Sequence, residues 1–278
     1  MLRFCLLTWF VLQAATTWAI RPVANWWAKP DTLGLAYQPL TLTTPDHLHL
    51  AAWLIAPAAA APNQHTTLVI AGGDAGNMAG YLYEARAFTS AGYQVLLFDY
   101  RGFGHSDAYP LDLARLYYQE FATDLRTALR EARRLAPRHQ RVGILGYSMG
   151  SLLGAQVAAI TRCDFLLTEG YVGNPQATVA RIWAKSQKLV TLPAEAAAYA
   201  RVAPHVNCPW LLIAGTEDQK TPLADSAAAV QAARPRQRRQ LLSVKCDHLG
   251  AAEVLTSQEY GDAYVQAVSR FLAGGQAG

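Results

Sequence analysis

The sequence has few cysteines and lacks the common metal-binding and cofactor-binding motifs. Only four of its 278 residues are cysteine, and Cys5 falls in the apolar N-terminal stretch. The other three are an odd number, so no disulfide framework is encoded. The chain has no HExxH, no paired CxxC and no phosphate-binding P-loop. We therefore expect no metal and no cofactor, and a fold that depends on its hydrophobic core.

A strong excess of charge of one sign is also missing. Lys and Arg total 24 against 20 Asp and Glu, a formal net charge of +4 that is spread along the chain. Nucleic-acid-binding domains concentrate basic residues in patches, so this balance predicts no nucleic-acid partner. Hydrophobic residues make up 52% of the chain. A chain of this length and composition is expected to bury one sizeable core.

The N-terminal segment has the pattern of a signal peptide. Arg3 precedes an apolar run that starts at Phe4, and small residues follow it as far as Ala19. The alternative is an uncleaved anchor over residues 1–20, close to the ~20 residues that span a bilayer. We predict an exported chain, periplasmic or extracellular, with residues 1–19 as signal peptide or membrane anchor and residues 20–278 as the folded domain. An anchored form would associate with the membrane through this segment.

Apolar strand-like runs alternate with helical patterns along the rest of the chain. Continuous apolar runs are typical of strands that are buried on both faces. A helical stripe from Tyr117 to Leu135 lies between two of them. Strand, helix and strand in succession predict an α/β fold with a mostly parallel central sheet covered by helices on both faces. The residues from 40 to 57 indicate an antiparallel hairpin that turns at 44–46. The expected strands of the central sheet are residues 66–72, 93–100, 141–148, 164–170, 209–215 and 239–245.

One serine lies at a predicted strand-to-helix turn. Gly146-Tyr147-Ser148-Met149-Gly150 follows the strand that starts at residue 141 and precedes an apolar helical pattern. A turn tight enough to project a serine brings the flanking positions together, so only small residues fit at Gly146 and Gly150. This context is typical of a nucleophile elbow. The backbone N–H of Met149 would then point at the oxygen of the carbonyl under attack.

A serine nucleophile needs a histidine base and a carboxylate, each placed at the end of a strand. Asp218 follows the strand that ends at residue 215, and His248 follows the next strand. The order Ser148, Asp218, His248 is the one expected for this architecture. Glu217 is the neighbouring carboxylate, and Asp218 is preferred to it on strand-end register. The other histidines weighed for the base are His105 and His205.

These residues together resemble the α/β-hydrolase superfamily, from about residue 35 onward. The stretch "AGGDAGNMAGYL" at 71–82 is similar to the HGNAGN-type oxyanion loop of the membrane-linked serine hydrolases that include the abhydrolase-domain depalmitoylases. This resemblance implies that the backbone N–H of Asp74, beside Gly73, is the second oxyanion donor, opposite Met149. Gly72 stands where that family usually has histidine, and Asp74 where it has asparagine. A carboxylate turned inward would oppose a developing oxyanion.

The sequence therefore predicts a serine hydrolase that cleaves an ester or thioester through an acyl-enzyme, without metal or cofactor. The expected partner is a small-molecule ester or acyl substrate, with an apolar acyl group. Residues 171–207 are expected to form a small cap insertion, whose apolar side chains, Trp183 and Leu189 among them, are candidates to line an acyl pocket. Two alternatives remain: a serine peptidase on the same fold, and a catalytically silent binding or scaffold protein.

Overall fold

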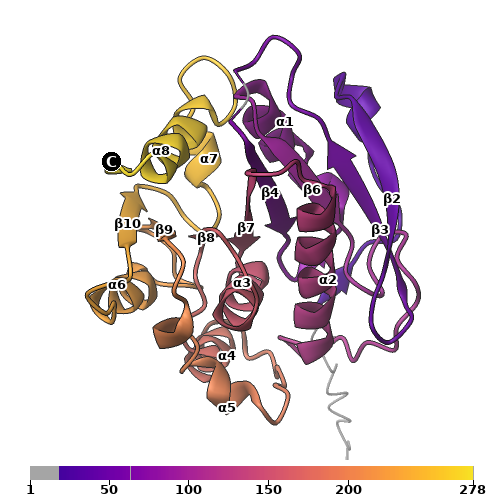
Figure 1. Cartoon of the computed structure of the whole chain (residues 1–278). Helices are drawn as coiled ribbons and strands as arrows, with labels where there is room; N and C mark the ends of the chain where they lie inside the picture. Colours follow the sequence, from indigo (N-terminus) through magenta and orange to yellow (C-terminus); the bar gives the residue numbers. More distant parts are fainter. Residues whose placement is uncertain (1–18, 63, 278) are drawn as a thin grey trace, which may run out of the picture.

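The computed structural model describes residues 19–62 and 64–277 of the chain (Figure 1). The predicted leader lies outside the described residues except for Ala19, so its role stays a prediction. Within the part that is described, no helix combines the length and the apolar character needed to cross a bilayer.

An eight-stranded sheet forms the centre of the molecule, in the order β10-β9-β8-β7-β4-β6-β3-β2. The pairings β2–β3 and β3–β6 are antiparallel, and all the others are parallel. The six predicted central strands and the hairpin are confirmed. The strands are β2 (Tyr37–Thr43), β3 (His49–Ile55), β4 (Thr66–Ala71), β6 (Gln94–Phe98), β7 (Arg141–Tyr147), β8 (Leu166–Glu169), β9 (Trp210–Gly215) and β10 (Arg239–Val244).

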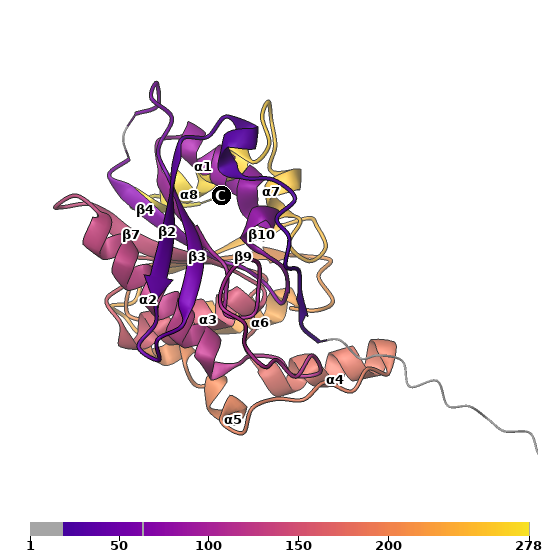
Figure 2. The same ribbon diagram turned by 90° about the vertical axis from the view of Figure 1, so that its right-hand side faces the viewer.

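Helices cover both faces of the sheet, as Figure 2 shows. One face carries α1 (Leu82–Ser90), the short α7 (Ala251–Val254) and α8 (Asp262–Leu272). The other carries α2 (Gln119–Leu135), α3 (Met149–Ile160) and α6 (Leu223–Gln231). Every residue of β4 and of β9 is buried, which explains why those strands read as continuous apolar runs.

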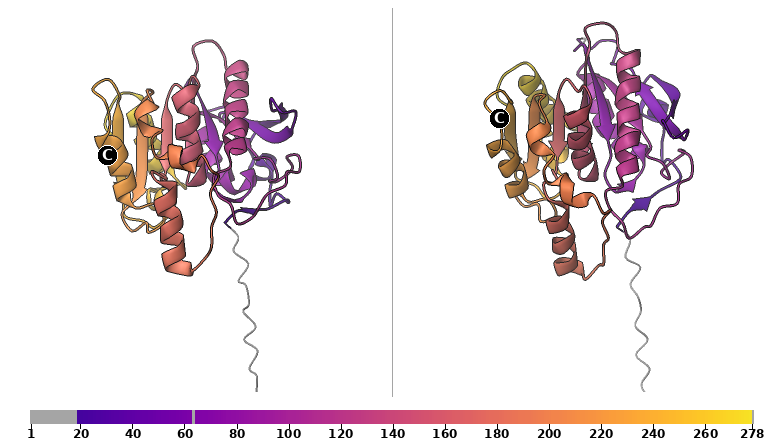
Figure 3. Two further views of the ribbon diagram at one scale, coloured as in Figure 1. Left: turned by 90° about the horizontal axis from the view of Figure 1, so that it is seen from below. Right: turned by 60° about the horizontal axis from the view of Figure 1, so that its bottom comes forward.

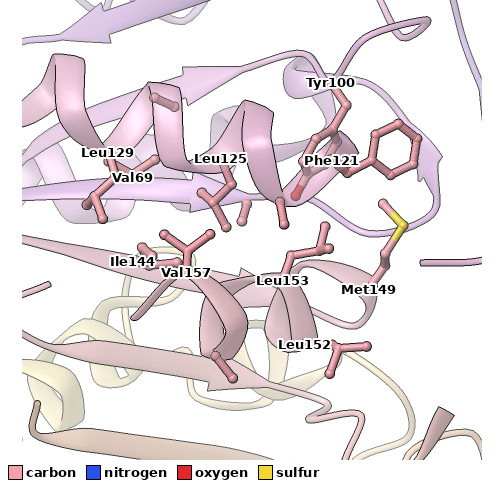
Figure 4. Packing of buried hydrophobic residues seen from close by; sticks show 14 of the residues in the cluster. Val69, Tyr100, Phe121, Leu125, Leu129, Ile144, Met149, Leu152, Leu153 and Val157 are labelled. Atoms are coloured by element: carbon pink, nitrogen blue, oxygen red, sulfur yellow. The ribbon is translucent and has the colours of Figure 1, made fainter. Parts of the chain in front are cut away.

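The packing of α2 and α3 against the sheet places the serine turn. Leu125 and Leu129 of α2, with Leu153 and Val157 of α3, meet the sheet around Ile144 (Figure 4). Each such side chain contributes ~1.5–3 kcal/mol when fully buried. These contacts fix the start of α3, and with it the end of β7, in the middle of the sheet.

The helix α2 begins two residues later than the apolar stripe suggests. Tyr117 is buried but has a left-handed backbone with φ 60°, so it precedes the helix, which starts at Gln119. The expectation of a helix that includes Tyr117 was therefore wrong. Its side chain is apolar enough to join the stripe, while its backbone turns the chain into the helix.

The cap segment 171–207 contains α4 (Pro175–Ser186), α5 (Ala196–Tyr199) and a 3-10 turn, η3 (Ala203–His205). Asn174 caps α4 by accepting a hydrogen bond from Ala177 N, and Pro175 occupies its first turn. The helix α4 projects from one end of the molecule (Figure 3). Trp183 is 47% exposed and Leu189 66% exposed. These two side chains lie on the surface and do not line an enclosed pocket.

The residues 19–28 form an N-terminal strap across the carboxyl end of the central strands. Within it β1 (Arg21–Pro22) pairs in parallel with β5 (Ala75–Gly76), the two-residue strand of the loop after β4. The strap leads into a 3-10 turn, η1 (Pro30–Leu33). A second 3-10 turn, η2 (Met78–Tyr81), follows β5 and leads into α1.

Candidate active site

Ser148 stands alone between β7 and α3, in a conformation that serine rarely adopts. Its φ is 50° and its ψ is −113°. A Cβ added at Gly146 would overlap the carbonyl oxygen of Gly150, and one added at Gly150 would overlap that of Ala71. Small residues are therefore required at both positions, for the steric reason that the sequence indicated.

Three side chains from separate strand ends meet at this turn. His248 Nε2 lies 3.0 Å from Ser148 Oγ, and His248 Nδ1 lies 2.7 Å from Asp218 Oδ2. The side chain of Asp218 is 1% exposed and that of His248 10% exposed. Asp218 comes directly after β9 and His248 after β10. The structure thus brings together the three residues that the sequence singled out.

The groups around Asp218 keep its carboxyl group ionised, so that it acts as a hydrogen-bond acceptor. Burial opposes its ionisation, but hydrogen bonds from His248 and Thr221 outweigh burial and keep its pKa below the usual value. Thr221 Oγ1 donates to Oδ2 at 2.6 Å, and the backbone N–H groups of Lys220 and Thr221 donate to Oδ1 at 2.8 and 2.9 Å. An ionised carboxylate only accepts, so His248 Nδ1 carries the proton. In the neutral ring Nε2 is then free to accept from the Ser148 hydroxyl.

The other candidates lie elsewhere. Glu217 is exposed, whereas Asp218 is buried. His105 stacks on Trp26 with ring centroids 3.6 Å apart, beside β3. His205 is an exposed residue of η3.

The loop from Gly72 to Asn77 faces the serine turn from the end of β4. A Cβ placed on Gly73 would lie 3.8 Å from Ser148 Cβ, so this loop passes directly over the serine. The backbone N–H of Asp74 belongs to this loop, and that of Met149 to the first turn of α3, where backbone N–H groups lack intrahelical partners. The two predicted donors therefore come from two separate segments that border Ser148, the loop after β4 and the first turn of α3.

A tyrosine that the sequence reasoning missed supports this loop from inside. Tyr81 of η2 accepts a hydrogen bond from Gly73 N at 2.6 Å, and its ring stacks on that of Tyr147. A Cβ on Gly72 would lie 2.7 Å from the Tyr81 ring. Gly72 is thus explained, because the tyrosine ring fills the space that a side chain at this position would occupy.

Gly72 and Asp74 both depart from the family pattern, and Asp74 is the less favourable of the two for an oxyanion hole. Burial raises the pKa of its carboxyl group, and the nearby backbone N–H of the same residue partly offsets this effect. This N–H is the predicted oxyanion donor, so a carboxylate beside it would compete with a substrate oxygen for it.

Glu169 is a second residue that the sequence reasoning missed. Its backbone carbonyl accepts from Ser148 N at 3.0 Å, and its Oε1 accepts from Ala251 N at 2.9 Å. It thereby joins the serine turn to the chain just after His248. Burial raises the pKa of Glu169 to about 7. Its position at the end of the predicted strand 164–170 was the available signal.

No group of three or more His, Cys, Asp or Glu side chains among the described residues is arranged to hold a metal ion.

Comparisons with known proteins agree on the fold. The family model described as "alpha/beta hydrolase fold" matches residues 66–164, which run from β4 to the residues just after α3. Among solved structures, the esterase Pf2001 of Pyrococcus furiosus superposes with a TM-score of 0.72 at 18% identity, over 92% of this chain and 99% of that one. The chain has the α/β-hydrolase fold, the fold class that its sequence predicted.

Two curated relatives are similar in sequence. The uncharacterized protein YfhR of Salmonella typhi is 25% identical over 84% of this chain and 82% of its own length. The uncharacterized membrane protein YNL320W of Saccharomyces cerevisiae is 35% identical over 82 residues, which are 29% of this chain and 28% of that protein. Neither name specifies a substrate.

Proposed function

We propose that the chain is a serine hydrolase that cleaves carboxylic esters or thioesters with an apolar acyl group. The observation that carries the proposal is the chain of hydrogen bonds from Ser148 through His248 to Asp218. The similarity of the fold to a known esterase supports hydrolysis as the reaction. The oxyanion loop that resembles that of the depalmitoylase group keeps thioesters among the proposed substrates.

In the proposed reaction, His248 Nε2 takes the hydroxyl proton while Ser148 Oγ bonds to the substrate carbonyl carbon. The N–H groups of Met149 and Asp74 stabilise the oxyanion of the tetrahedral intermediate. His248 returns the proton to the leaving alkoxide or thiolate, and an acyl-enzyme remains. Water then attacks the acyl carbon, His248 takes its proton, and the acid leaves as Ser148 recovers its hydrogen. Asp218 stabilises the imidazolium in both halves of the cycle.

A peptidase is the second candidate. The acylaminoacyl peptidase of Pyrococcus horikoshii has a TM-score of 0.64 at 18% identity, although this chain spans 41% of that protein. A site for a substrate amine requires an acidic group, and Glu195 is the one acidic residue in the cap segment 171–207. It is exposed. This arrangement disfavours a peptidase that recognises a free substrate amine.

For the location, we propose export through residues 1–19, as a cleaved leader or as a membrane anchor. N-terminal sequencing of the protein recovered from the membrane and soluble exported fractions distinguishes the two. An intact Met1 on cytoplasmic protein would contradict both.

The proposed function is tested with a fluorophosphonate probe and a panel of chromogenic esters and thioesters of increasing chain length. We expect the probe on Ser148 by intact mass and peptide mapping. Ser148→Ala is expected to abolish labelling and to reduce turnover by a factor on the order of 10³ or more, with stability nearly unchanged. Labelling of another residue, or retention of most of the turnover by Ser148→Ala, would contradict the proposal. A chain without labelling or turnover would be a silent scaffold.

A further inference from the structure

The N-terminal strap, residues 19–28, is hydrogen-bonded along the outer side of the oxyanion loop, residues 72–77. Arg21 N donates to Asp74 O at 2.8 Å, and Val23 N donates to Gly76 O at 3.0 Å. The Asn77 side chain donates in the opposite direction, from the loop to the strap. Its Nδ2 donates to Val23 O and to Asn25 O, both at 2.9 Å. These bonds join segments about fifty residues apart in sequence.

The strap is fixed where it begins. Ile20 is fully buried and its N–H donates to Leu113 O at 3.1 Å, a contact that cleavage after Ala19 does not remove. In the uncleaved chain the N–H of Ala19 donates to the same oxygen at 2.6 Å. Leu113 belongs to the segment ahead of α2 that also forms a bridge to the cap, between Arg115 and Thr191. The beginning of the strap therefore cannot shift without disturbing the core and this segment.

The far end of the strap is fixed by an aromatic anchor. The Trp26 ring lies between His105 and Trp53, at centroid distances of 3.6 and 4.6 Å, and its Nε1 donates to Asp99 Oδ2 at 2.8 Å. Oδ1 of the same carboxyl group accepts from Met78 N at 2.7 Å. Asp99 thus connects the strap to the residue that follows the oxyanion loop, and both ends of the strap are held independently of the loop.

The oxyanion loop has few other means of holding its shape. Its strand β5 lies outside the eight-stranded sheet and pairs only with β1 of the strap within the described residues. Gly76 has φ 85°, a conformation that its lack of a side chain permits. The bond from Arg21 N fixes the carbonyl of Asp74, and with it the peptide that follows the proposed oxyanion donor. Tyr81 fixes the preceding residue from the inner side.

We infer that the N-terminal strap is a positioning element of the active site, which holds the backbone N–H of Asp74 where the oxyanion forms. Asn77, at the end of the oxyanion loop, is the positioning residue whose side chain binds the loop to the strap. The inference rests on the proposed function, because it assigns the strap to the oxyanion donor of that reaction. A displaced donor weakens stabilisation of the transition state more than binding of the substrate, so kcat depends on the strap and KM does not.

The test uses Asn77→Asp in the full chain. Asn77 Oδ1 accepts from Ala79 N at 3.1 Å and caps η2. Aspartate keeps this cap but loses both donors and sets a carboxylate against the carbonyls of Val23 and Asn25. We expect kcat for a chromogenic ester to fall at least about tenfold and the rate of fluorophosphonate labelling of Ser148 to fall with it, while KM stays within about twofold.

The control is Gln140→Glu. It makes the same change from amide to carboxylate and removes a 2.8 Å side-chain bond to Thr67 Oγ1, at the amino end of β7 and away from the site. Its kcat is expected to stay within about twofold of the parent. Thermal melting of all variants, with assays well below each midpoint, separates loss of turnover from loss of fold.

If Asn77→Asp does not fold, the variant Trp26→Phe tests the strap inference instead. Phenylalanine keeps a ring between His105 and Trp53 but loses the bond to Asp99, and we expect a fall in kcat of about threefold with KM unchanged. A folded strap variant that is labelled on Ser148 and keeps the parental kcat would overturn the strap inference and leave the proposed function standing. A parent chain that is not labelled on Ser148 would overturn both.

Discussion

The two sides of the candidate site are built differently. The serine turn lies between a central strand and a buried helix, and its shape follows from close packing at Gly146 and Gly150. The oxyanion loop lies beyond the end of β4 and is held by Tyr81 and by the strap, which precedes it by about fifty residues in the sequence. The proposed nucleophile is therefore held by the packing of the core. The proposed oxyanion donor lies in a loop that is held by a few hydrogen bonds between segments far apart in sequence.

The largest expected effect concerns the close packing of the serine turn. Gly150→Ala places a methyl group against the carbonyl oxygen of Ala71 in a packed region, and we expect the free energy of unfolding to fall by ~3 kcal/mol or more. The matched control is Gly80→Ala in η2, where an added Cβ meets nothing within 4 Å. Urea denaturation of both variants measures the difference. Equal midpoints would show that the serine turn tolerates expansion and that close packing does not define it.

A second effect concerns the link between the serine turn and the His248 segment. Because the pKa of Glu169 is about 7 in the folded chain and lower when unfolded, the unfolded chain loses its proton first as pH rises. Ionisation of Glu169 therefore lowers the free energy of unfolding progressively as the pH rises from about 4.5 to about 7. Above pH 7 the loss is complete and no longer changes with pH.

Glu169→Gln removes this ionisation and keeps an acceptor for Ala251 N. The variant should gain stability relative to the parent across the same pH range, by up to about 3 kcal/mol above pH 7 and by little below pH 4.5. Denaturant titrations at several pH values provide the measurement. A stability difference that does not vary with pH would show that Glu169 ionises normally in the folded chain.

The smallest expected effect concerns Asp74 in the oxyanion loop and is measured as a change in kcat/KM. Asp74→Asn removes a charge that competes for the proposed oxyanion donor, and we expect kcat/KM for esters to rise about fivefold, equivalent to ~1 kcal/mol. The gain should grow as pH rises, because the parental carboxyl group ionises. Glu131→Gln, on α2, is the control for loss of one negative charge. A fall in kcat/KM with Asp74→Asn would indicate that the carboxylate assists the reaction.

The sequence predicted the serine side of the site better than the loop side, for a physical reason. Because β7 and β9 are buried on both faces, they appear as apolar runs. The edge strand β10 is only partly buried, but it carries the short apolar pair Leu241-Leu242. The ends of all three strands could therefore be placed, and with them Ser148, Asp218 and His248. Those signals are local. The catalytic roles of Ser148, Asp218 and His248 are proposed, whereas the contacts between their side chains are observed.

The loop side depends on contacts between segments that no local pattern relates. The pairing of Arg21 with Ala75 joins two strands of two residues each, too short to give a periodic signal. The interaction of Tyr81 with Gly73 requires η2 to fold back over the loop, and a tyrosine in this position is equally consistent with a core residue. Tyr117 was misplaced into α2 because hydrophobic periodicity reports side chains and not backbone angles.

The backbone of Ser148 has a consequence for how such a chain can change over time. A residue with a side chain at φ 50° and ψ −113° stores conformational strain, on the order of 1–3 kcal/mol, which glycine would largely relieve. Selection for thermostability alone would therefore favour glycine at this position and remove the hydroxyl group. A stabilised descendant could keep the whole architecture and have no nucleophile, so persistence of the serine in any lineage would itself record selection for chemistry.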